Sequence, residues 1–153
     1  MVSNTDVFRI FELFDDYQKI EERLKLYTES TKFKFSTGNS KTLAGIKNLP
    51  ENYNSKLIYD EKYFKCNVNP KPSTLKNFLK KNPGVKVDRC PALIVFRTTP
   101  SKQHLKITQL KLEHDHDPSA PPRLEEYKKQ VAEGKNIQEN DIVVSIWALQ
   151  FSQ

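Results

Sequence analysis

The sequence is short of cysteine, glycine and long apolar runs. It contains 2 cysteines and 4 glycines among 153 residues. So few glycines leave no Gly-rich loop that would cradle a phosphate. No apolar stretch approaches the roughly 20 residues needed to span a bilayer, and the mean hydropathy is −0.69. We therefore expect a polar globular protein with one main domain, not a membrane protein.

The opening residues also lack the features of a secretory signal. MVSNTDVFRI has no basic region, apolar region or small-residue cleavage site. We expect a reducing, intracellular environment, in which a lasting disulfide between Cys66 and Cys90 is disfavoured. The two cysteines are then free thiols or metal ligands.

Positive charge is concentrated in the middle of the chain. The formal net charge is +6, but residues 1–31 sum to −3, residues 32–89 to +9, and residues 90–153 to zero. A basic segment is typical of nucleic-acid binding, because neutralising phosphates releases counterions. A lysine-rich solvated surface explains the same pattern about equally well.

Hydrophobic periodicity predicts a helix followed by short strands. Tyr17, Ile20, Leu24 and Tyr27 recur at helical spacing, and Asp15 with Gln18 provides a start signal. Segments rich in β-branched and aromatic residues follow, namely KFKFS, KLIYDEKYFKCNV, CPALIVFR and HLKITQLKLEH. They predict an antiparallel sheet of about four strands, with the helix on one face.

Two more helices are expected further along. KPSTLKNFLKKNPGVK fits a short helix that is capped by Ser73 and ended by Pro83 and Gly84. The Pro-rich segment DPSAPPRLEE marks a break, and a helix from about 123 to 133 follows it. The apolar end of the chain either begins another element or docks back on the first domain.

Two cysteines and two histidines are placed to bind one metal ion. Structural zinc takes four thiolate or imidazole ligands in a tetrahedron. Cys66 ends one expected strand, Cys90 opens the next, and His114 and His116 close the last. Side chains two residues apart in a strand share a face, so the two histidines can approach one ion. Each 23-residue gap between successive ligands allows the chain to return.

Each of these residues also has a simpler explanation. Free cysteines often pack in a core, and EHDHD is also a plausible solvated strand end. The ordered set of four favours one structural zinc ion over those explanations. His104 is expected to be exposed and not a ligand.

The runs YFKC, CPALIVF and ITQLKLEHDHDPSAP carry a family resemblance. They resemble the zinc-binding half of the WRKY and glial-cells-missing superfamily. The likeness is strongest to the far-red-impaired-response type and to the N-terminal domains of SWIM-zinc-finger proteins, which are related to Mutator-like transposases. It covers about residues 11–118. It implies the same four ligands and a nuclear, sequence-specific DNA-binding module of transposon origin. The WRKYGQK strand of the plant domains has no counterpart before Cys66.

Together these observations predict an α+β fold. An N-terminal helix is followed by a zinc-clasped antiparallel sheet of about four strands and a C-terminal helical tail. The expected domain spans residues 8–118, and residues 119–153 form a Pro-rich linker with a helical and apolar tail.

The leading functional hypothesis is binding of double-stranded DNA in the nucleus, in a transcription-factor-like or transposase-derived role. Lysine meets phosphate as a point charge, whereas arginine suits base reading. The candidate contacts are the basic residues of the +9 segment: Lys56, Lys62, Lys65, Lys76, Lys80, Lys81, Lys86 and Arg89.

Two alternatives come from other classes of function. A zinc-stabilised protein-interaction module that no longer binds DNA would use the apolar tail after Pro122. An enzyme is the weakest option, because a catalytic zinc keeps an open position and four protein ligands close the site. Glu113 and Asp115 would point away from His114 and His116 in an extended strand.

Overall fold

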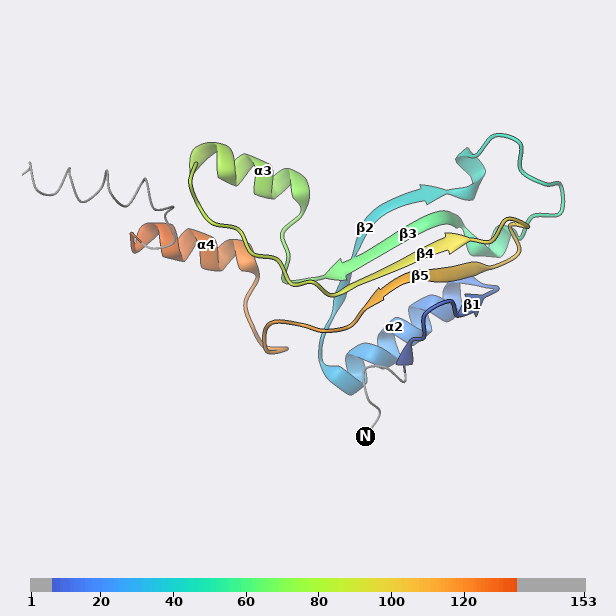
Figure 1. The fold of residues 1–153 in the computed structure, drawn as a ribbon, viewed down its shortest axis with the longest axis horizontal. Coiled ribbons are helices and arrows are strands. Elements are labelled where there is room, and N and C mark those ends of the chain that lie inside the picture. Colours follow the sequence, from blue (N-terminus) through green and yellow to red (C-terminus); the bar gives the residue numbers. More distant parts are fainter. Residues whose placement is uncertain (1–6, 135–153) are drawn as a thin grey trace, which may run out of the picture. The chain divides into compact units, whose positions relative to one another are not determined.

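The computed structural model describes residues 7–134, and these residues combine an antiparallel sheet with helices (Figure 1). The predicted α+β fold class is therefore confirmed. The chain forms two compact units. Within the described residues, the first comprises residues 7–67 and 90–120, and the second comprises residues 68–89 and 121–134. None of the helices in the described range is long and apolar enough to cross a membrane.

The first unit is built on a five-stranded sheet in the order β1-β5-β4-β3-β2. Every neighbouring pair is antiparallel. The four longer strands correspond to the four predicted segments, and the short β1 was not expected. The strands are β1 (Leu13–Phe14), β2 (Phe35–Thr42), β3 (Tyr59–Cys66), β4 (Leu93–Thr98) and β5 (Leu105–Lys111).

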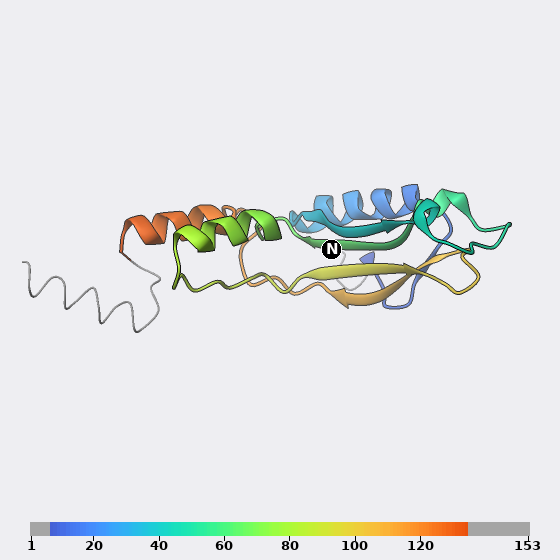
Figure 2. The same cartoon turned by 90° about the horizontal axis from the view of Figure 1, so that it is seen from above.

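Helix α2 (Tyr17–Thr31) lies along one side of this sheet (Figures 1 and 2). Its buried residues are Tyr17, Ile20 and Tyr27, which are three of the four positions that the periodicity selected. They join strand side chains such as Phe64 and Phe96 in one hydrophobic core. The predicted helix and its buried face are confirmed.

The residue that caps α2 differs by one from the expected residue. The side chain of Asp16 accepts a hydrogen bond from the backbone N–H of Gln18 at 2.9 Å. Asp15 instead forms an exposed ion pair with Lys19. The cap must have extended backbone before the first helical residue, and Asp16 has it, with φ −153° and ψ 128°.

Alternation along the strands divides the sheet into two faces. On β4, Ile94 and Phe96 point into the core on the α2 side. On β5, Leu105 and Ile107 do the same, but Thr108 is an extra residue because Val95 pairs with Gln109 and Phe96 with Ile107. A bulge of this kind changes which residues face the core. After it, Leu110 and Leu112 pack on the core, which sets the direction of the residues that follow.

The second unit pairs α3 (Pro72–Lys81) with α4 (Arg123–Ala132). Leu75 and Phe78 of α3 are buried with Tyr127 of α4. The predicted α4 is confirmed, and α3 presents the expected apolar residues to the protein. Ser73 is not the cap of α3, because the helix begins at Pro72 and no side chain bonds its first turn. Residues 135–153, which include most of the predicted apolar tail, lie outside the described residues.

Candidate metal centre

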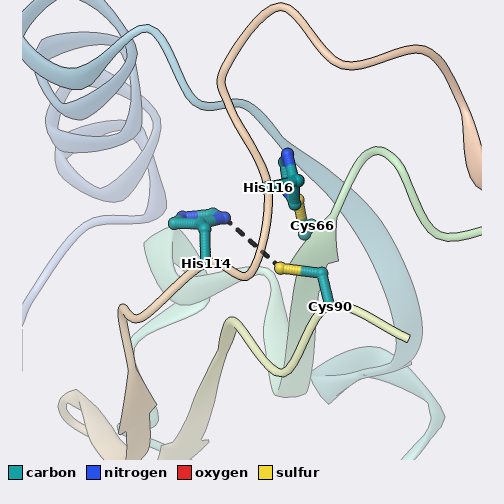
Figure 3. A group of neighbouring side chains, drawn as sticks. All are labelled: Cys66, Cys90, His114 and His116. Carbon is teal, nitrogen blue, oxygen red and sulfur yellow. Dashed lines mark hydrogen bonds between the residues drawn. The ribbon is translucent and has the colours of Figure 1, made fainter. Parts of the chain in front are cut away.

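The four predicted ligands come together at one end of the sheet in the first unit. Cys66 is the last residue of β3, and Cys90 lies in the segment that leads into β4. His114 and His116 follow the end of β5. One ligand atom from each of the four residues lies within 4.8 Å of all the others. Figure 3 shows the four side chains turned toward one another.

The distances and the donor types fit zinc. The Sγ atom of Cys66 is 3.2 Å from Nε2 of His116, and the Sγ atom of Cys90 is 3.4 Å from Nδ1 of His114. Ligand atoms around a tetrahedral zinc are about 3.3–3.8 Å apart, given its bond lengths to sulfur and nitrogen. Both cysteines are buried and free of disulfide bonds. The cluster is therefore compatible with a zinc ion held by Cys66, Cys90, His114 and His116.

The hydrogen bonds of the two histidines show which nitrogen each one offers. The Nε2 atom of His114 is 2.8 Å from the hydroxyl of Tyr27, so its Nδ1 atom is left for the cluster. The Nδ1 atom of His116 is 2.7 Å from the carbonyl oxygen of Asp117, so its Nε2 atom is left for the cluster. An imidazole whose outer N–H is held by a second group is fixed in tautomer and orientation for metal binding.

Aromatic rings enclose His114. The ring of Phe33 stacks on it, with centroids 3.7 Å apart and planes within 2°. Tyr27 and Phe35 lie on other sides. Burial in this shell, followed by the nearby His116, lowers the pKa of His114 to about 4. The ring is neutral at pH 7, which is the form that binds a metal.

The shape of the cluster favours a structural role. Four protein donors match the number that tetrahedral zinc takes in structural sites. Glu113 and Asp115 flank His114 in the sequence and are exposed, while His114 and His116 turn toward the cysteines (Figure 3). His104 is partly exposed and is not in the cluster.

Most of the predicted DNA contacts are accessible. Lys65 is partly exposed, and the exposed residues are Lys56, Lys76, Lys80, Lys81, Lys86 and Arg89. Lys62 is different, with an exposed fraction of 4%. It shares the core face of β3 with Phe64 and Cys66, and its Nζ atom lies 4.2 Å from the ring centre of Tyr59. Lys62 is therefore not placed to contact a phosphate backbone, and we remove it from the candidate contacts.

Sequence reasoning missed the residues that support the ligands. The periodicity placed Tyr27 on the buried side of α2 but gave no partner for its hydroxyl. Phe33 lies just before β2, and its spacing from Phe35 placed both in one strand. Nothing in the local pattern connects either phenylalanine to His114, about 80 residues later in the sequence.

Comparison with known proteins agrees with this centre. Searches against curated proteins and against solved structures found no match. A family model described as Zinc finger SWIM domain-containing protein 3, N-terminal, matches residues 8–116. The matched range runs from just before β1 to the last of the four candidate ligands and covers more than half of the chain. The chain therefore belongs to the family of Zinc finger SWIM domain-containing protein 3, N-terminal domains.

Proposed function

We propose that this chain is a zinc-dependent domain that binds double-stranded DNA in the nucleus. Its role would be that of a transcription factor or of a domain derived from a transposase. The observation that supports the proposal best is the accessibility of the +9 segment. Seven of its eight candidate residues are at least partly exposed, so their charges are available to phosphates.

Zinc has a structural role in this proposal. The cluster joins the end of β3, the entry to β4 and the segment after β5. An ion there would link these three chain segments, and its binding free energy would add to the stability of the fold. The ion itself does not touch DNA.

The proposal extends the family assignment in one direction. The resemblance to WRKY, glial-cells-missing and far-red-impaired-response domains supports DNA as the partner. The β2 sequence, FSTGNSKT, has no arginine and one lysine. Lysine and backbone contacts give affinity more readily than sequence discrimination, so we expect binding with weak sequence preference.

A salt series tests DNA binding directly. The zinc-loaded protein is titrated against a labelled duplex while the salt concentration is raised. We expect log K to fall linearly with log salt, with a slope of about −0.9 for each phosphate contacted. No binding at low salt, or binding that is indifferent to salt, would contradict the proposal. A variant in which three lysines of α3 are changed to Gln measures how much this helix contributes to duplex binding. The three are Lys76, Lys80 and Lys81.

A protein-interaction module is the second candidate. Four exposed apolar side chains favour it, because they line two adjoining hollows beside α2. These side chains are Ile10, Phe11, Leu13 and Leu26. The predicted apolar tail after Pro122 is a separate candidate surface for a protein partner. Deleting residues 135–153 and, separately, changing Phe11 and Leu26 to Ser discriminates between the candidates. Duplex binding that survives both changes supports the DNA proposal, and loss of a copurifying protein partner supports the alternative.

A further inference from the structure

The sheet of the first unit has a second face, opposite α2, and α2 is the one α-helix that the structure describes in this unit. Because paired residues share a face, the strand registers define its composition. We call it the outer face. Its members are Ser36, Gly38 and Lys41 on β2, Glu61, Tyr63 and Lys65 on β3, Leu93, Val95 and Arg97 on β4, and Lys106, Thr108, Gln109 and Lys111 on β5.

The outer face is strongly positive. It carries five basic side chains and one carboxylate, that of Glu61. Glu61 pairs with Arg97 at 3.1 Å and with Lys41 at 3.6 Å. Among the described residues, Lys65, Lys106 and Lys111 form no ion pair with a carboxylate.

The positive charges form two rows across the strands. One row runs from Lys41 across Glu61 to Arg97 and Lys106 through successive register partners, so it holds three cations and the one carboxylate of the face. The other contains Lys65 and Lys111 on either side of Leu93. Four residues along β3 or β4 separate the rows, which is about 13 Å in an extended strand.

Uncharged residues lie between the rows and keep them apart. Val95 is fully buried under its neighbours. Gly38 approaches β3 closely, since a Cβ atom there would be 3.1 Å from Cβ of Tyr63. Arg97 donates to the hydroxyl of Tyr63 at 2.7 Å and to that of Thr108 at 2.9 Å. These bonds hold one cation in place before any partner arrives.

We propose that the outer face is where the first unit contacts duplex DNA, with each row of cations meeting phosphates on one side of the major groove. The inference rests on the proposed function and gives it a location that the lysines of α3 do not supply. The positive charge of the outer face favours a polyanion as its partner. The separation of the two rows favours a duplex over a single strand. The major groove is about 12 Å wide, whereas a single strand offers only one line of phosphates.

A charge-matched pair of variants tests this location. The first variant is Lys41→Gln, Lys65→Gln and Lys111→Gln on the outer face. The second variant is Lys19→Gln, Lys25→Gln and Lys47→Gln, three exposed lysines of the same unit that lie elsewhere. Both variants lose three positive charges, so a difference in DNA binding between them shows that the location of the lysines matters. Each is used as the full zinc-loaded chain, and its melting temperature is compared with that of the parent.

We measure binding of a labelled mixed-sequence duplex, and of one of its single strands, over a salt series. For the outer-face variant we expect the slope of log K against log salt to fall by about 2–3 units, at roughly 0.9 per phosphate contact. The affinity near 0.1 M salt should then drop by on the order of a hundredfold or more. For the second variant we expect little change in slope.

Other outcomes would distinguish a wrong location for DNA binding from the absence of DNA binding. Equal slopes in both variants, with a parent that binds duplex, would overturn the outer face and leave DNA binding intact. A parent that binds no duplex would overturn the proposed function as well. Preference for the single strand or for an acidic protein would overturn the duplex assignment. If the triple variant does not fold, Lys65→Gln with Lys111→Gln tests the same face, because neither residue has an ion pair to lose.

Discussion

Tyr27 links the helix to the metal centre through one hydroxyl group. Its side chain is fully buried, and burial raises its pKa to about 12, so the hydroxyl stays protonated. The hydroxyl meets Nε2 of His114 at 2.8 Å. A group in this position orients the ligand without touching the metal.

Replacing Tyr27 by Phe is expected to weaken zinc binding by about 10–100-fold, the usual effect of losing an outer partner of a metal ligand. The free energy of unfolding should fall by about 1–3 kcal/mol, because a buried imidazole N–H loses its acceptor. Competition with a chromophoric chelator measures the affinity. Tyr17→Phe is the control, since Tyr17 lies in the same helix and packs edge-on against Tyr59. Equal zinc affinity in the two variants would contradict the role of Tyr27.

Lys62 shows how the alternation of side chains along a strand decides whether a charged side chain is buried or exposed. Lys62, Phe64 and Cys66 alternate on the core face of β3, whereas Lys65 faces the other way. We expect Lys62→Met to leave the salt dependence of DNA binding unchanged, because the Lys62 side chain is not accessible. Lys65→Met is the matched variant and should lower the slope by about 1. Fluorescence anisotropy over a salt series measures both, and a fall in slope for Lys62→Met would reverse this placement.

At the scale of elements, the start of α2 depends on one of two adjacent aspartates. Asp16 caps the helix, and Asp15 pairs with exposed Lys19. Asp16→Ala is expected to lower the free energy of unfolding by about 1 kcal/mol, since a backbone N–H in the first turn loses its acceptor. Asp15→Ala should have a smaller effect, because its ion pair with Lys19 is exposed to solvent. Urea denaturation of the zinc-loaded protein compares them. The reverse order would show that Asp15 is the cap in solution.

The elements also show which structural features the sequence can predict. The spacing of Tyr17, Ile20 and Tyr27 predicts α2 because 3.6 residues per turn set which side chains are buried. Strand β1 has only two residues, too few for any period, and it exists because it pairs with β5. The packing of α3 against α4 joins segments about 50 residues apart, and no local pattern encodes such a contact.

The same limit applies to the metal centre. The order and residue types of Cys66, Cys90, His114 and His116 were sufficient to select them, because few combinations of residues suit tetrahedral zinc. The stacking of Phe33 on His114 was not predictable, since it depends on where β2 lies relative to the end of β5. The burial of Lys62 was within reach of the sequence, because it alternates with Phe64 and Cys66.

At the scale of the whole molecule, zinc is expected to determine the stability of the first unit. An ion present at a thousand times its Kd stabilises the folded state by about 4 kcal/mol. For a unit of this size that corresponds to a rise in melting temperature of roughly 15–30 °C. Removing the metal with a strong chelator should therefore lower the melting temperature by a similar amount.

Differential scanning calorimetry, together with metal analysis, measures this effect. His104→Ala is the control and should keep both its zinc and its response to the chelator, because His104 is not in the cluster. Cys66→Ser should lose the metal and melt low with or without chelator. A parent that melts at the same temperature after complete removal of metal would show that the site does not stabilise the fold.

The distance along the chain between the first and last ligands has a consequence for how the protein is made. Cys66 and His116 are 50 residues apart, and at about 5–20 residues per second a ribosome needs roughly 3–10 s to synthesise that stretch. During this interval Cys66 alone, and then Cys66 with Cys90, lacks the imidazoles that complete the site. The nascent chain is then open to oxidation and to capture by softer metals such as Cu(I), which prefer thiolate ligands. All four ligands can bind zinc only after the residues that follow β5 have been synthesised. The supply of reducing agent and of zinc during translation should therefore limit the yield of folded protein.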